Sequence, residues 1–178
     1  MAAGGSPGAW VGFLPDFLTL SRIALGPAFV VLLVGSPGAA TVVAGVAALS
    51  DFVDGKIARR LGQASSRGAI LDVSSDAVFV LSSLAALAWQ GVVSPLLPLA
   101  AGISLGALAR AWGRRGPGGG PRALPDRIGH AAGVLNYGAA FFGAGVLALD
   151  RPFSLVLASQ VVAVLNVLPL LLRLRATR

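Results

Sequence analysis

Four aspartates stand close together in a chain that is otherwise poor in charge. They form two pairs, Asp51 with Asp54 and Asp72 with Asp76, spaced three and four residues apart. Residues at these spacings lie on one face of a helix, so each pair would project two carboxylates from one helical surface. Two helices that face each other with such pairs would form one acidic pocket.

The sequence around the aspartates is strongly apolar. The 178-residue chain is 56% hydrophobic and 12% charged, with a mean hydropathy of +0.82, whereas soluble domains average about 25% charged residues. This composition predicts an integral membrane protein, in which one aspartate at mid-membrane costs about 2.5–3.5 kcal/mol. Four uncompensated aspartates would cost about 10 kcal/mol, which is comparable to the stability of a whole domain. Cations must therefore compensate them.

Divalent metal ions account for the cluster better than internal ion pairs. Lys56, Arg59 and Arg60 could pair with some of the aspartates, but pairing does not explain why the acids cluster while the bases spread. Mg²⁺ prefers hard oxygen ligands and commonly combines a few carboxylates with the phosphate oxygens of a substrate. Two such ions can stabilise both the attacking and the leaving oxygen. The pattern therefore favours phosphoryl chemistry on a phosphorylated substrate.

The apolar segments predict an all-α fold, in which residues 1–178 form a single domain with six transmembrane helices. Each segment is close to the ~20 residues that cross a bilayer core. Before the first one, Trp10, Phe13, Leu14 and Phe17 recur at helical offsets and predict a short interfacial segment. The six segments are Phe17–Val34, Ala39–Leu61, Ala69–Trp89, Val92–Trp112, Ile128–Leu149 and Phe153–Leu174.

The basic residues predict the orientation in the membrane. Six alternating spans put both termini and the two polar connections, 62–67 and 113–125, on one side. Thirteen of the 14 Lys and Arg residues fall on that side and only Arg151 falls opposite, which is the bias of cytoplasmic loops. We therefore expect a cell-membrane protein whose termini and acidic site are cytoplasmic. The net charge of +7 then reflects topology and anionic membrane lipid, not nucleic acid.

The aspartates belong to a longer pattern that resembles the full signature of the CDP-alcohol phosphatidyltransferase family. Every position and both gap lengths are present. The pattern reads Asp51-x-x-Asp54-Gly55-x-x-Ala58-Arg59, then eight residues, then Gly68-x-x-x-Asp72-x-x-x-Asp76. The first span adds PDFLTLSR at residues 15–22, which is similar to the N-x-L-T-x-x-R opening of several bacterial members, with Asp16 where asparagine is usual.

The resemblance implies a transferase that moves a phosphatidyl group from CDP-diacylglycerol to an alcohol in phospholipid biosynthesis and releases CMP. Two divalent ions, Mg²⁺ or Mn²⁺, would bind to Asp51, Asp54, Asp72 and Asp76. Asp76 would also be the base that takes the proton of the acceptor hydroxyl. The nucleotide would be bound by small residues, which let it approach the backbone, and by a guanidinium that matches phosphate oxygens: Gly55, Ala58, Arg59 and Gly68.

The acceptor is the part that the sequence defines least. Family members that make phosphatidylglycerol phosphate typically carry lysine directly after the last aspartate, and those that make phosphatidylinositol phosphate carry arginine, but here this residue is Ala77. Glycerol 3-phosphate is the best single prediction, and inositol phosphate or serine are alternatives. The acceptor-binding candidates are polar residues expected near the cytoplasmic surface: Thr19, Arg22, Arg110, Arg114 and Arg122.

The aspartates are also compatible with a different class of function, a transporter. Intramembrane aspartates also relay protons or cations in transporters. A relay needs ionisable groups at the midplane or across the whole bilayer, whereas these four are expected in the cytoplasmic halves of two spans. The small residues and the arginine beside them also suit a nucleotide. The transferase is therefore the favoured reading.

Two further patterns concern helix packing. The GxxxG sequences at 102–106 and 129–133 allow close helix approach, either within the bundle or between the two subunits of a homodimer. Asn136 and Tyr137 lie deeper in the fifth segment. We expect them to be interhelical hydrogen-bond partners and not site residues.

Overall fold

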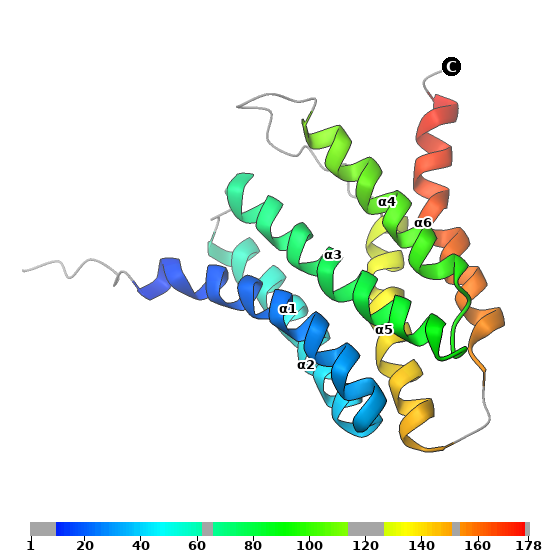
Figure 1. Cartoon of the computed structure of the whole chain (residues 1–178). Helices are drawn as coiled ribbons and strands as arrows, with labels where there is room; N and C mark the ends of the chain where they lie inside the picture. Colours follow the sequence, from blue (N-terminus) through cyan, green and yellow to red (C-terminus); the bar gives the residue numbers. More distant parts are fainter. Residues whose placement is uncertain (1–9, 62–65, 114–126, 151–153, 177–178) are drawn as a thin grey trace, which may run out of the picture.

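The computed structural model describes residues 10–61, 66–113, 127–150 and 154–176, with side chains described for 21–53, 73–110, 131–150 and 154–172. These ranges contain six α-helices and no strand, which confirms the predicted six-helix bundle (Figure 1). The helices are α1 (Trp10–Gly35), α2 (Pro37–Leu61), α3 (Ser66–Trp89), α4 (Leu96–Gly113), α5 (Arg127–Ala148) and α6 (Val156–Ala176).

The helices follow the six predicted segments and differ from them mainly at two ends. α1 begins at Trp10, so the stretch predicted as a separate interfacial segment is continuous with the first helix. α4 begins at Leu96 and not at Val92, because α3 ends in a tight turn. Gly91 has a φ of 74°, and the Val92 N–H donates to the Leu87 carbonyl at 3.0 Å. This glycine-terminated cap keeps Val92 out of the next helix.

Large apolar side chains cover the outside of the bundle. Exposed valine, leucine, isoleucine, phenylalanine or tryptophan side chains occur on all six helices, and Trp89 at the end of α3 is 91% exposed. Among the described residues, Ala131–Ala148 of α5 is long and apolar enough to cross a bilayer, and the apolar stretches of the other helices are shorter. A surface this apolar around a whole bundle is typical of a protein in contact with lipid.

Helices α1 and α5 connect the two helices that carry the aspartates. Both α1 and α5 pack against α2 and against α3. A chain of aromatic rings lies at this junction: the centroids of Phe29 and Phe79 are 5.9 Å apart, and those of Phe79 and Tyr137 are 5.3 Å apart. The rings join α1, α3 and α5 about one helical turn from Asp76. They therefore fix the positions of these helices along one another.

The other half of the bundle, α4 and α6, is joined to α5 through buried polar groups. The side chains of Asn136 and Asn166 exchange two amide hydrogen bonds of 3.0 Å. The Ser104 hydroxyl donates to the main-chain carbonyl oxygen of Asn166. Such pairs stabilise helix association in an apolar environment, where unsatisfied polar groups are costly. The predicted interhelical role of Asn136 is confirmed.

Close contact between α1 and α3 depends on Gly26. A Cβ atom on Gly26 would lie 2.8 Å from the Ser82 Oγ, and 3.2 Å from both the Phe79 Cα and the Val78 carbonyl oxygen. The last two atoms belong to the backbone and cannot move aside without displacing the helix. Glycine at this position therefore sets the distance between α1 and α3.

We predict that Gly26→Val destabilises the protein by about 1–3 kcal/mol, the usual cost of overpacking a close contact. Thermal unfolding in detergent, compared with the unsubstituted chain, measures the effect. Gly138→Val in α5 is the matched control, because a Cβ there meets no atom within 4 Å. Equal stability of the two variants would contradict the role assigned to Gly26.

Candidate active site

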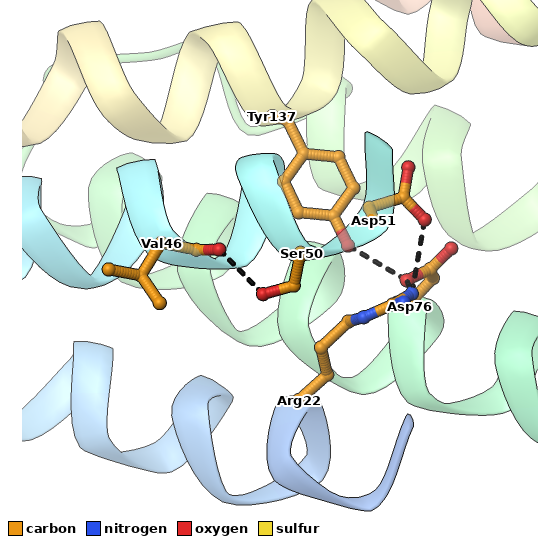
Figure 2. A network of polar contacts seen from close by, with 6 residues as sticks. All are labelled: Arg22, Val46, Ser50, Asp51, Asp76 and Tyr137. Carbon is orange, nitrogen blue, oxygen red and sulfur yellow. Dashed lines mark hydrogen bonds and ion pairs between the residues drawn. The ribbon is translucent and has the colours of Figure 1, made fainter. Parts of the chain in front are cut away.

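Arg22 brings the two halves of the acidic motif together. Its Nη1 donates to Oδ1 of Asp51 on α2 at 3.1 Å and to Oδ1 of Asp76 on α3 at 2.5 Å (Figure 2). The Arg22 side chain is fully buried, whereas those of Asp51 and Asp76 are 40% and 25% exposed. The guanidinium therefore closes the inner side of the site, and the carboxylates remain accessible from the outer side.

The local sequence explains how these groups reach one another. Arg22 lies one helical turn before Gly26, on the same face of α1, and Asp76 lies about one turn before Phe79 on α3. The close contact at Gly26 therefore places Arg22 opposite Asp76. On α2, Ala47 is fully buried one turn before Asp51, and this small side chain lets α2 approach its neighbours closely.

The way the carboxylates meet differs in one respect from the sequence prediction. Two motif helices that face each other were expected, but among the described residues α2 makes its extensive contacts with α1 and α5, and α3 makes its own with α1, α4 and α5. Asp51 and Asp76 are thus joined through a side chain of a third helix. The spacing of the aspartates within α2 and within α3 does not indicate that a side chain of a third helix connects them.

Tyr137 of α5 is a member of this site that the sequence analysis did not place there. Its hydroxyl donates to Oδ1 of Asp76 at 2.8 Å. The expected interhelical hydrogen bond is confirmed, and its partner is Asp76, so the structure brings Tyr137 next to a predicted site residue. The residue type could have indicated this contact. Tyr137 is the only tyrosine of the chain, and a buried tyrosine hydroxyl usually has a polar partner.

The donor set at this point suits a hard divalent cation. Two carboxylate oxygens from different helices converge on one positively charged nitrogen, so the fold already holds a cation between them. Mg²⁺ prefers carboxylate oxygen ligands of this kind. No cluster of three or more His, Cys, Asp or Glu side chains occurs within the ranges whose side chains are described.

The remaining predicted site residues are placed only in part. Arg110 lies exposed in the last turn of α4. Arg114 and Arg122 fall outside the described residues. The others lie within α1, α2 and α3, but their side chains are not among those described: Thr19, Asp54, Gly55, Ala58, Arg59, Gly68 and Asp72.

Comparison with known proteins identifies the family. A sequence profile described as CDP-alcohol phosphatidyltransferase matches residues 12–168, which include all four aspartates and Arg22. The chain belongs to the CDP-alcohol phosphatidyltransferase family. This family is membrane-associated and generally depends on divalent metal ions, which agrees with the apolar surface of the bundle and with the donor set at Asp51 and Asp76.

Individual relatives in the family match over shorter stretches. A cardiolipin synthase (CMP-forming) of Streptomyces coelicolor is 37% identical over 93 residues, which cover 48% of this chain and 43% of the relative. A CDP-diacylglycerol--glycerol-3-phosphate 3-phosphatidyltransferase of Escherichia coli is 42% identical over 71 residues, 38% of this chain and 39% of the relative. An enzyme of the latter name from Blochmanniella floridana is 36% identical over 75 residues, 40% of each chain. The chain thus matches less than half the length of each.

We predict that Arg22→Gln destabilises the protein in the presence of a chelator by about 2–3 kcal/mol. Loss of one partner from a fully buried ion pair costs about 3–5 kcal/mol, and the partial exposure of Asp51 and Asp76 lowers this figure. Added Mg²⁺ or Mn²⁺ should restore part of the loss, because it replaces the missing positive charge. Unfolding in detergent, with and without the metal, measures both effects.

The same substitution at an exposed arginine, Arg110→Gln, is the control and should change the stability little. An Arg22→Gln protein as stable as the unsubstituted chain in chelator would show that the ion pairs do not hold the site together.

Proposed function

We propose that this protein transfers a phosphatidyl group from CDP-diacylglycerol to a small polar alcohol in phospholipid synthesis and releases CMP. The observation that carries the proposal is the convergence of Asp51 and Asp76, from the two halves of the family motif, on one cationic nitrogen. Family membership and the names of the relatives support the same reaction.

In the proposed reaction, the acceptor hydroxyl oxygen attacks the phosphorus that bears the diacylglycerol. A new phosphorus–oxygen bond forms, and the bond from this phosphorus to the bridging oxygen of the diphosphate breaks. Its electron pair leaves with CMP, and the hydroxyl proton passes to the carboxylate of Asp76. A base must reach hydrogen-bond distance of the proton that it takes. The partly exposed carboxylate of Asp76, at the edge of the buried site, meets this requirement better than a fully buried one.

We assign two divalent ions, Mg²⁺ or Mn²⁺, to Asp51, Asp54, Asp72 and Asp76. When bound, such ions neutralise charge on the diphosphate and stabilise the attacking and leaving oxygens. Asp51 and Asp76 support this assignment because their oxygens already flank a cation. Arg22 would hold these carboxylates in place, since its charge offsets part of their repulsion.

The nucleotide is assigned to the residues between the two pairs of aspartates. Gly55, Ala58 and Gly68 would leave room for the cytidine moiety against the backbone, and Arg59 would contact its phosphates. These four positions lie on the same two helices as the aspartates, so one substrate could meet the metal ligands and the nucleotide-binding residues together.

Glycerol 3-phosphate is the acceptor that we favour, because relatives from two organisms carry it in their names. Its phosphate is assigned to Thr19, Arg110, Arg114 and Arg122. Arg22 is fully buried and bonded to Asp51 and Asp76, so its position favours a role in holding the aspartates. Inositol phosphate and serine are the other soluble acceptors of this proposal.

An acceptor that is itself a lipid is the second candidate. Ala77 lacks the basic group that members acting on acceptor phosphates carry after the last aspartate. A relative from Streptomyces coelicolor is named a CMP-forming cardiolipin synthase. Cardiolipin contains two phosphatidyl groups, so an acceptor in its synthesis can already carry one of them and needs no free phosphate site.

We further propose that the bundle spans the cell membrane with both termini and the site at the cytoplasmic face, as the distribution of basic residues indicates. A homodimer is part of this proposal. Gly106 and Gly133, one glycine from each GxxxG sequence, have open space around an added Cβ, so these two positions could accept a helix of a second copy.

The proposed function is tested by CMP release from CDP-diacylglycerol. The purified chain is supplied with Mg²⁺ or Mn²⁺ and, in turn, with glycerol 3-phosphate, phosphatidylglycerol, inositol phosphate and serine. We expect release with one acceptor and none with chelator. Absence of release with every acceptor would refute the proposal, and release with phosphatidylglycerol alone would select the lipid acceptor.

We predict that Asp76→Asn retains binding of the CDP group but lowers turnover by about 10²–10⁴-fold, the contribution typical of a general base. The amide keeps the size of the side chain and cannot take up the proton. Binding is measured by equilibrium dialysis with labelled CDP-diacylglycerol in detergent, and turnover by CMP release. Normal turnover would remove Asp76 from the role of base.

We also predict that Asp54→Ala weakens Mg²⁺-dependent binding of the CDP group, because a metal ligand is lost. Ser50→Ala is a suitable control on the same helix, since the Ser50 hydroxyl donates to the Val46 carbonyl of its own helix at 2.7 Å (Figure 2). The measurement is the affinity for labelled CDP at increasing Mg²⁺. The same metal dependence in Asp54→Ala and in the control would argue against the assigned metal site.

A further inference from the structure

We infer that Tyr137 is a positioning residue for Asp76: its hydroxyl holds one carboxylate oxygen so that the other is presented to the acceptor. The inference rests on the proposed function, in which Asp76 is the base, and it adds a residue outside the family motif. The phenol does not touch the substrate in this role and acts through the carboxylate alone.

The hydrogen bonds of Asp76 divide its two oxygens. Nη1 of Arg22 and the hydroxyl of Tyr137 both donate to Oδ1, at 2.5 and 2.8 Å. Within the described part of the chain, Oδ2 receives no hydrogen bond, and Figure 2 shows it on the opposite side of the carboxylate from the Tyr137 hydroxyl. Two donors on one oxygen restrict rotation of the carboxylate and leave the two lone pairs of Oδ2, one for the proposed metal ion and one for the proton of the acceptor.

The position of the Tyr137 hydroxyl is itself fixed by its surroundings. The phenol ring is buried and stacks on Phe79, with centroids 5.3 Å apart and an interplanar angle of 12°. Phe79 is on the same helix as Asp76, about one turn away. The preceding residue, Asn136, is held by the reciprocal amide pair with Asn166 of α6. Packing among α3, α5 and α6 therefore determines where the hydroxyl points.

Chemistry at the acceptor makes this restraint useful. A general base contributes only when its lone pair lies within hydrogen-bond reach of the proton, and a misplacement of about 1 Å can cost ~100-fold in rate. Arg22 alone could hold Oδ1, but Arg22 also binds Asp51, so its side chain can move together with the Asp51 carboxylate. Tyr137 makes its bond from a different helix. The two donors together define an orientation that neither defines alone.

Tyr137→Phe tests the inference, because it removes the hydroxyl and keeps the ring that stacks on Phe79. We expect kcat for CMP release, normalised to folded protein, to fall about 10-fold, within the ~100-fold that a 1 Å misplacement can cost. KM for CDP-diacylglycerol should remain unchanged, because the CDP contacts are elsewhere. In the Asp76→Asn background the same substitution should have no further effect on the residual rate.

The matched control is Ser83→Ala in α3. It removes a buried hydroxyl that donates to the Val80 carbonyl and not to Asp76. It should leave kcat unchanged. A purely structural role of Tyr137 would lower the unfolding temperature without changing kcat per folded molecule. An unchanged kcat in Tyr137→Phe, or a loss that persists in full in the Asp76→Asn background, would overturn the inference.

The outcome for the unsubstituted chain separates the two proposals. Release of CMP by that chain with a normal Tyr137→Phe rate would overturn only the positioning role. Without CMP release from the unsubstituted chain, the proposed function fails and the catalytic role of Tyr137 fails with it. A double-mutant cycle of Tyr137→Phe and Asp76→Ala by thermal unfolding needs no activity, and additive shifts in the unfolding temperature would overturn the contact itself.

Discussion

The ion pairs of Arg22 are the interaction on which the site depends. Carboxylates held close together in an apolar bundle repel each other, and their partial burial lowers the effective dielectric constant below that of water. A buried guanidinium between Asp51 and Asp76 offsets this repulsion. Desolvation of charges is costly, so the pairing is favourable only where the geometry is fixed. The close contact at Gly26 provides that geometry.

Arg22 also explains how a motif split between two helices works as one site. α2 and α3 carry the aspartates, and α1 and α5 pack against both of them. Each of these two connecting helices sends one polar side chain to Asp76, Arg22 from α1 and Tyr137 from α5. Asp76 is therefore restrained from two directions by helices that lie outside the pattern from Asp51 to Asp76. The packing of α1 and α5 therefore also determines the geometry of the site.

The sequence predicted the helices, the aspartate pairs and the family because these are local signals. Apolar runs of bilayer length define spans, and carboxylates three or four residues apart must share a helix face. Which helices pack together is not local. In a membrane bundle the lipid-facing and core-facing surfaces are both apolar, so no amphipathic stripe shows which face meets which neighbour. The bridge from Arg22 to two aspartates, and the contact of Tyr137 with Asp76, depend on that information.

The arrangement also bears on where the acceptor is selected. The inner oxygen of Asp76 is occupied by two donors of the protein, and the burial of Arg22 closes that side. In the proposed reaction the outer oxygen would take the proton of the acceptor hydroxyl, and this contact alone would not distinguish one alcohol from another. A reaction centre of this kind serves any alcohol that reaches it. Selection among acceptors would then come from residues further out, which agrees with the uncharged side chain of Ala77 and with the different reactions that the names of the relatives describe.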